Sequence, residues 1–244
     1  MRYWGLSTTG MRQHNEDNYY TPDGSDCELV IVADGMGGHL SGEIASNLAK
    51  EEVIAQIKRC NIIIKPEKAL REAILAANTV VLEYGKLNNA SRGLGTTIVA
   101  ALLYSDRFSI GYVGDSRIYL YTAVDGKLSR LTQDHSYVAE LVRQGMITEK
   151  EALHHPYRNV ITRAVGTSDY VEVDTASFDW NKGDALLLCS DGLSGSLDDL
   201  TIEEIMNEYL NTDELCQTLI DSALEAGSTD NITVAVAVNA ENDL

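Results

Sequence analysis

Two aspartates in this chain each follow directly on a run of apolar residues. Asp34 comes after residues 29–33, and Asp191 comes after residues 185–190, in which only Ser190 is polar. Runs of this kind, without apolar–polar alternation, are typical of strands that are covered on both faces. A carboxylate at the end of such a strand is costly unless a cation or several hydrogen-bond donors meet it. The chain must therefore fold in layers around these strands and supply partners for both carboxylates.

Helical and strand-like patterns alternate in blocks, which predicts an α+β fold with helices packed on antiparallel sheets. No linker is evident, so we expect one domain over residues 1–244, with two short helices in a mixed segment at 135–165. The predicted strands are 3–8, 28–33, 96–103, 107–113, 117–122, 127–131, 171–178, 184–190 and 232–238. The other predicted helices are 41–59 with Ser41 as N-cap, 66–86 with Pro66 in its first turn, 201–209 with a capping box of Thr201 and Glu204, and 213–226.

The net charge of −18 over 244 residues excludes several partners. A chain this acidic does not bind nucleic acid through a general field, and anionic membranes repel it. There is no apolar run long enough for a transmembrane helix and no signal-peptide pattern at the start. The four cysteines lie far apart without a Cys-x-x-Cys pair, which excludes a zinc knuckle. We therefore expect a cytoplasmic protein without nucleic-acid or membrane partners.

The acidic residues are concentrated in the last quarter of the chain. Residues 183–244 contain 14 Asp and Glu and no Lys or Arg, whereas residues 1–182 contain 23 acidic and 19 basic side chains. A block of like charge usually indicates a disordered tail. Here apolar runs at 185–189 and 233–238 interrupt it, so we expect a folded segment whose acids lie mostly on solvated faces.

Three further aspartates lie near strand ends. Asp115 follows a predicted strand, Asp230 precedes the last one, and Asp17 is expected in the loop after the first. Carboxylates at the ends of different strands can converge at one edge of a sheet stack, and such oxygen ligands suit Mg²⁺ or Mn²⁺. Each aspartate alone has a structural alternative, because Asp191 can cap a short turn and Asp115 can pair with Arg117. The prediction of a shared cation site rests on all five carboxylates together.

Eight stretches of the sequence, taken in order, resemble the metal-dependent protein phosphatases, the type 2C serine/threonine phosphatases, in their compact bacterial form. The resemblance extends essentially from end to end. The stretches are RQHNED at 12–17, VADGMGGH at 32–39 with GEIAS at 42–46, GTT at 95–97, GDSR at 114–117, DHS at 134–136, ITRAVG at 161–166, CSDGL at 189–193 and DNITV at 230–234.

This resemblance implies a four-layer α-β-β-α sandwich, two antiparallel sheets flanked by helix pairs, with a flap at about 136–165. It also implies a binuclear Mn²⁺ or Mg²⁺ centre in a cleft at one end of the sandwich. Bacterial members often bind a third metal. By motif position, the resemblance implies that Asp34 bridges both metals, that Asp191 and Asp230 complete the shell of one metal, and that the Gly35 carbonyl binds the other. Asp115 with Asp191 would bind a third metal, and Asp17 would hold metal-bound water. Glu16 and Asn231 would lie beside the ligands, and Arg12 would bind the substrate phosphate.

The implied roles suit phosphate monoester hydrolysis, in which an anionic nucleophile must approach a dianion. Two metals make hydroxide available near neutral pH and neutralise the phosphoryl oxygens, and Arg12 adds a planar fork matched to phosphate. Attack is then direct and in line, by water. None of the four cysteines has an arginine six positions on, so a covalent cysteine mechanism is unsupported.

One position departs from the pattern of many eukaryotic relatives, which have a histidine directly after the metal-binding Asp-Gly. Here that residue is Met36, and His39 is the substitute candidate for the general acid. The alternatives are that His39 is only a loop residue and that a metal-bound water protonates the leaving group. His154 and His155 lie in the expected flap, either facing substrate or merely exposed.

The predicted function is that of a phosphoserine/phosphothreonine protein phosphatase, acting as a monomer on phosphorylated proteins and opposing a bacterial serine/threonine kinase. One alternative is a phosphatase dedicated to a single regulator of the anti-sigma-factor-antagonist type. Another is a catalytically silent phosphopeptide- or cation-binding regulator on the same fold. Every acidic ligand position that can be matched is intact, which favours the active enzyme.

Overall fold

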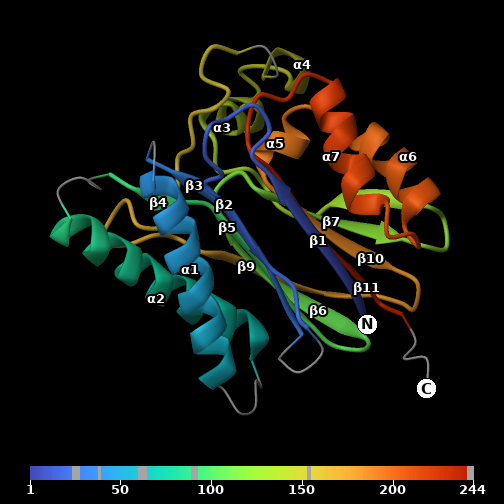
Figure 1. The fold of residues 1–244 in the computed structure, drawn as a ribbon, viewed down its shortest axis with the longest axis horizontal. Coiled ribbons are helices and arrows are strands. Elements are labelled where there is room, and N and C mark those ends of the chain that lie inside the picture. Colours follow the sequence, from blue (N-terminus) through green and yellow to red (C-terminus); the bar gives the residue numbers. More distant parts are fainter. Residues whose placement is uncertain (24–27, 38–39, 60–64, 89–92, 153–154, 241–244) are drawn as a thin grey trace.

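Two β-sheets lie face to face between two pairs of helices (Figure 1). The computed structural model describes residues 1–23, 28–37, 40–59, 65–88, 93–152 and 155–240. All pairings between the strands are antiparallel. The predicted α+β class and the four-layer α-β-β-α sandwich are therefore confirmed. Within the described ranges, no helix combines the length and the apolar character needed to cross a membrane.

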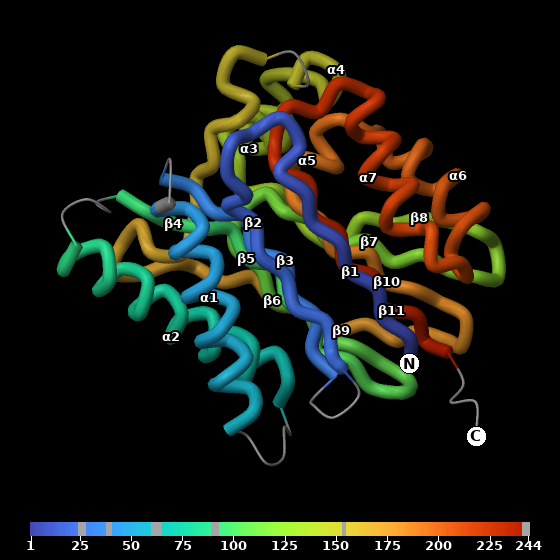
Figure 2. The backbone as a smooth tube through the Cα atoms, viewed as in Figure 1, coloured from blue at the N-terminus to red at the C-terminus, as the bar shows by residue number. Residues whose placement is uncertain are grey.

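The first sheet has the strand order β1-β11-β10-β7-β8, and the second has the order β2-β3-β5-β6-β9 with β4 paired to β3. Figure 2 shows β1 beside β11, so the two ends of the described chain pair in one sheet. The first-sheet strands are β1 Arg2–Thr8, β7 Arg117–Thr122, β8 Lys127–Arg130, β10 Ala185–Cys189 and β11 Ile232–Val238. The second-sheet strands are β2 Asp17–Tyr20, β3 Leu29–Met36, β4 Gly95–Thr96, β5 Ile98–Leu103, β6 Arg107–Val113 and β9 Asp174–Asp179.

Helices cover the outer faces of both sheets. The pair α1 and α2 packs on the second sheet, α6 and α7 pack on the first, and α3 and α4 lie at one end of the sandwich (Figure 1). The helices are α1 Leu40–Arg59, α2 Pro66–Leu87, α3 Tyr137–Arg143, α4 Glu149–Ala152, α5 Asp191–Ser194, α6 Asp199–Tyr209 and α7 Leu215–Glu225.

The apolar runs occupy strands that are covered on both faces, as their patterns predict. In β10, Leu187 faces the α6–α7 layer, whereas Leu186 and Leu188 face the opposite sheet. In β3, Ile31 packs toward α1 and α2, whereas Val32 lies between the sheets. Successive side chains of a strand point to opposite faces, so a strand with a layer on each side must be apolar at every position.

Three local predictions are wrong. Asp17 is the first residue of β2 and does not lie in a loop. Helix α1 begins at Leu40, so Ser41 is inside the helix and cannot be its N-cap. Helix α6 begins at Asp199, because the Asp198 carboxylate accepts a hydrogen bond from the Thr201 amide at 2.8 Å, and this cap replaces the predicted capping box.

Candidate metal centre

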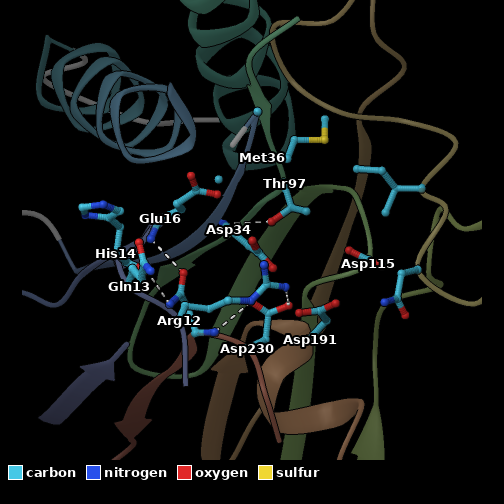
Figure 3. A pocket seen from close by; sticks show the side chains of 15 residues that line it. Arg12, Gln13, His14, Glu16, Asp34, Met36, Thr97, Asp115, Asp191 and Asp230 are labelled. Carbon is cyan, nitrogen blue, oxygen red and sulfur yellow. Dashed lines mark hydrogen bonds and ion pairs between the residues drawn. The ribbon is translucent and has the colours of Figure 1, made fainter. Parts of the chain in front are cut away.

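A cavity of about 450 Å³ collects most of the predicted site residues. The loop between β1 and β2, the end of β3, the starts of α5 and β11, and the segment after α4 contribute to its walls. Figure 3 shows the carboxylates of Asp34, Asp191 and Asp230 close together, with Asp115 to one side. The lining residues are Arg12, Gln13, His14, Glu16, Asp34, Gly35, Met36, Gly37, Thr97, Asp115, Asn159, Ile161, Asp191, Asp230 and Asn231.

Strand register brings the carboxylates together from distant parts of the sequence. Asp17 in β2 lies directly opposite Asp34 in β3. Asp191 directly follows Ser190 at the end of β10, and Asp230 comes just before β11, which pairs with β10. The ends of neighbouring strands in two stacked sheets thus meet at one edge of the sandwich.

Burial and neighbouring negative charges raise the pKa values of Asp17, Asp34, Asp115 and Asp191. Burial raises the pKa of Asp34 well above its usual range, and the negative charges of the other four aspartates raise it further. Burial also raises the pKa of Asp17 to about 7, against hydrogen bonds that lower it, and that of Asp115 to about 8, with Asp191 as the main neighbouring charge. The pKa of Asp191 is raised by burial and by Asp230, and lowered by a hydrogen bond with Asp34. A cation among these oxygens would relieve both costs.

The donor set fits hard divalent cations. Asp17 is 6% exposed, and its Oδ1 atom is buried without a hydrogen-bond partner among the described residues. Carboxylate oxygens are the ligands that Mg²⁺ and Mn²⁺ prefer. As it stands, no group of three Asp, Glu, His or Cys side chains within the described ranges is arranged to hold a metal ion. Within the cavity, Asp230 is paired with Arg12, and Asp191 shares a hydrogen bond with Asp34.

Glycine is the only residue type that fits at position 35, beside Asp34. A Cβ atom there would lie 2.1 Å from the Gly42 carbonyl oxygen and 2.5 Å from that of Glu16. The same Glu16 carbonyl accepts hydrogen bonds from the Gly35 amide at 3.1 Å and from the Ser46 hydroxyl at 2.5 Å. This close packing of backbone keeps the Gly35 peptide in the wall of the cavity, where its carbonyl is a candidate ligand.

Asn231 holds the loop that carries Arg12. Its side-chain amide donates hydrogen bonds to the carbonyl oxygens of Thr9 at 3.0 Å and His14 at 2.9 Å, and its Oδ1 accepts one from the Glu16 amide at 2.8 Å. The side chain is 6% exposed. One buried amide thus ties both ends of the β1–β2 loop to the residue next to Asp230.

Arg12 lies in the cavity, where its Nη2 atom is 2.8 Å from the Oδ2 atom of Asp230. The arginine side chain is 58% exposed and the aspartate side chain 38% exposed. The predicted phosphate-binding residue and a predicted metal ligand are therefore paired with each other (Figure 3).

Two residues without a predicted role support the carboxylates. The Thr97 hydroxyl accepts a hydrogen bond from the Asp34 amide at 3.0 Å and is 2.7 Å from the hydroxyl of Ser116, next to Asp115. Ser190 donates to Asp17 Oδ2 at 2.8 Å and accepts from the Thr233 amide. Thr97 belongs to the GTT stretch at 95–97 and Ser190 to the CSDGL stretch at 189–193. Membership of these stretches was therefore the sequence signal that could have identified both residues.

The structure tests the two structural alternatives for single aspartates, an Asp115–Arg117 ion pair and Asp191 as the cap of a short turn. Arg117 forms a bidentate pair with Asp134, with Nη2–Oδ2 at 2.7 Å, and makes no ion pair with Asp115 within the described ranges. Asp191 opens the single turn of α5, whose N-cap is Ser190. A helix-start position does not exclude a second role for a carboxylate that also lines the cavity.

The expected flap contributes Asn159 and Ile161 to the wall of the cavity. The His155 ring lies beside those of Tyr137 and Tyr157, with centroids 6.0 and 5.8 Å away, and does not line the cavity. His39 and His154 lie outside the described residues, so the candidate general acid is not placed.

Comparison with known proteins identifies the family. The family model described as "Protein phosphatase 2C" matches residues 5–226. The serine/threonine phosphatase stp of Listeria monocytogenes is 38% identical over 238 residues, covering 96% of this chain and 92% of that protein. The crystal structure of the Mycobacterium tuberculosis serine/threonine phosphatase PstP/Ppp has a TM-score of 0.89 and 36% identity, covering 98% of this chain and 99% of that one. The catalytic domain of PstP in complex with two manganese ions gives 0.85 and 36%, with 97% of each chain covered. The chain therefore belongs to the protein phosphatase 2C family.

Proposed function

We propose that this chain is a metal-dependent protein phosphatase that hydrolyses phosphoserine and phosphothreonine at a binuclear Mn²⁺ or Mg²⁺ centre. The observation that carries the proposal is the convergence of five aspartates beside one arginine (Figure 3). Burial and neighbouring negative charges raise the pKa values of Asp17, Asp34, Asp115 and Asp191. The named relatives are serine/threonine phosphatases, and one was crystallised with two manganese ions.

In this proposal, Asp34, Asp191, Asp230 and the Gly35 carbonyl hold the two cations, and Asp115 with Asp191 holds a third. When bound, the cations supply a nucleophile near neutral pH and neutralise the phosphoryl oxygens. Asp17 lies behind the lining residues, and its Oδ1, which has no hydrogen-bond partner in the described part of the chain, can accept a hydrogen bond.

The chain's own residues bind and orient the substrate. The planar guanidinium of Arg12 matches two phosphoryl oxygens, and Asn231 keeps its loop in register with the carboxylates. Asn159 and Ile161 form the wall contributed by the expected flap, so the residues flanking the phosphorylated side chain pass between this segment and the β1–β2 loop.

The finer assignments follow from this activity. The substrates are phosphoproteins made by a serine/threonine kinase, and the enzyme works as a single-domain, cytoplasmic monomer. The test is a panel of phosphoserine and phosphothreonine peptides, with p-nitrophenyl phosphate as a generic substrate, assayed with and without Mn²⁺. We expect Mn²⁺-dependent turnover of several peptides. Turnover of one phosphorylated regulator only would support the dedicated phosphatase, and a folded, metal-loaded protein that hydrolyses none would support the silent binding protein.

Substitution of Asp115 tests the third cation separately. Because Asp115 lies to one side of the other carboxylates, we expect Asp115→Ala to lower kcat about tenfold while two Mn²⁺ ions still bind. Steady-state kinetics with calorimetric counting of bound Mn²⁺ measures both effects. Unchanged kinetics would remove the role of a third cation, and loss of all Mn²⁺ binding would place Asp115 in the binuclear centre itself.

A further inference from the structure

We propose that Arg12 and a divalent cation compete for Asp230, so that metal binding releases Arg12 to the substrate phosphate. This inference rests on the proposed function, because it uses Asp230 as a metal ligand and Arg12 as the phosphate-binding side chain. It adds a link between them: the chain is not competent to bind phosphate through Arg12 until a cation has taken its place on Asp230.

Both carboxylate oxygens of Asp230 are already in use. Its Oδ2 atom is 2.8 Å from Arg12 Nη2, and its Oδ1 atom accepts the Asn231 amide at 2.9 Å. The Asn231 amide belongs to the backbone that leads into β11, so it stays in place. A cation that binds Oδ2 would bring a second positive group to the oxygen that Arg12 contacts, and the repulsion between the two opposes the Arg12 contact.

The displaced side chain can move without its loop. Asn231 fastens the loop through Thr9, His14 and Glu16. A Cβ atom at Gly10 would lie 2.1 Å from the Asp230 carbonyl oxygen, so the backbone of the loop rests directly on that residue. By contrast, the Arg12 side chain is 58% exposed, and little packing opposes its rotation. Release of Arg12 is therefore a side-chain movement within the cavity.

Charge makes this pairing consequential. Among the described residues that line the cavity, Arg12 is the only Arg or Lys, and it shares the cavity with Glu16, Asp34, Asp115, Asp191 and Asp230. A guanidinium that is neutralised by Asp230 attracts a phosphate dianion weakly. Once a cation occupies Asp230, the arginine regains its full charge for phosphate. By linkage, a phosphate that holds Arg12 also strengthens metal binding.

The first test measures Mg²⁺ affinity by calorimetry on protein stripped with EDTA. We expect Arg12→Gln to bind Mg²⁺ about two- to fivefold more tightly than the native chain, the range that exposed ion pairs allow. The same substitution in an Asp230→Asn background should leave the remaining affinity unchanged. An equal gain in both backgrounds would indicate general electrostatics, and no gain in the native background would show that Arg12 does not compete; either result overturns the proposal.

The second test observes the arginine directly. In ¹⁵N NMR spectra, the Nε–Hε signal of Arg12, assigned with Arg12→Lys, should move on addition of Mg²⁺ toward its position in Asp230→Asn. The signal of Arg2, which is bonded to Asn211 at 2.7 Å, serves as the control and should stay in place. An Arg12 signal that is unmoved at saturating Mg²⁺ overturns the proposal.

The two tests separate this inference from the proposed function. A protein that hydrolyses phosphothreonine peptides while its Arg12 signal ignores Mg²⁺ keeps the function and overturns the competition. A protein that shows the Mg²⁺-dependent movement and the tighter binding of Arg12→Gln, yet turns over no phosphopeptide, supports the competition and overturns the function.

Discussion

Asp34→Asn abolishes Mn²⁺-dependent hydrolysis of phosphothreonine peptides in our expectation, with a loss of at least about 10³-fold in kcat/KM, or about 4 kcal/mol. The negative charges of all four other aspartates of the centre act on the Asp34 carboxylate. Asp34 therefore occupies the central position that a ligand shared by two cations requires. Asparagine keeps the shape of the side chain but removes the negative charge and one oxygen ligand.

Asp125→Asn is the matched control, because Asp125 also precedes a glycine but lies in the turn between β7 and β8, where it accepts a hydrogen bond from Thr122. Its kinetics should match those of the native chain. Melting curves of the EDTA-stripped variants guard against misfolding. Asp34→Asn should be at least as stable as the native chain, because asparagine avoids the cost of burying an ionisable carboxyl group. Retention of more than about a tenth of the activity in Asp34→Asn would contradict the assignment.

We expect the metal-free protein, stripped with EDTA, to lose stability as pH rises from about 5 to about 8.5. Burial raises the pKa of Asp17 to about 7 and that of Asp115 to about 8, from the ordinary aspartate value of 3.8. Between the unfolded and folded pKa values the folded chain binds more protons than the unfolded chain, so the free energy of unfolding falls with rising pH. For Asp17 alone the loss is on the order of a few kcal/mol.

Urea denaturation in EDTA at a series of pH values measures this slope. Asp17→Asn should flatten it, whereas Asp125→Asn should leave it unchanged. At pH 8, added Mg²⁺ should restore stability by mass action, because a bound cation favours the ionised carboxylates. Two results would contradict this prediction. One is a free energy of unfolding that rises steadily with pH across this window, and the other is a free energy of unfolding that is the same in EDTA and in Mg²⁺. Either would show that the carboxylates do not repel one another as the geometry implies.

Much of the fold follows from local pattern. Strands β6, β7 and β11 have the predicted bounds, because each combines an apolar face or run with clear turn residues at its ends. The short strand β2 escapes prediction, since its four residues begin with Asp17 and Asn18 and only pairing with β3 makes them a strand. The division of the predicted strand 96–103 into β4 and β5 is also tertiary, because the Thr97 amide donates to the Asp34 carbonyl at 2.8 Å.

By itself, the sequence determined that two apolar strands end in carboxylates, that both need covering layers, and that five aspartates stand near strand ends. These are local facts, because burial pattern and residue type are written along the chain. Only the tertiary structure decided that Asp17 lies opposite Asp34 on the neighbouring strand and that Asn231 fastens the β1–β2 loop. It also decided that Arg12 is paired with Asp230, 218 positions away. Register, desolvation and charge proximity arise between segments far apart in sequence, so no local pattern encodes them.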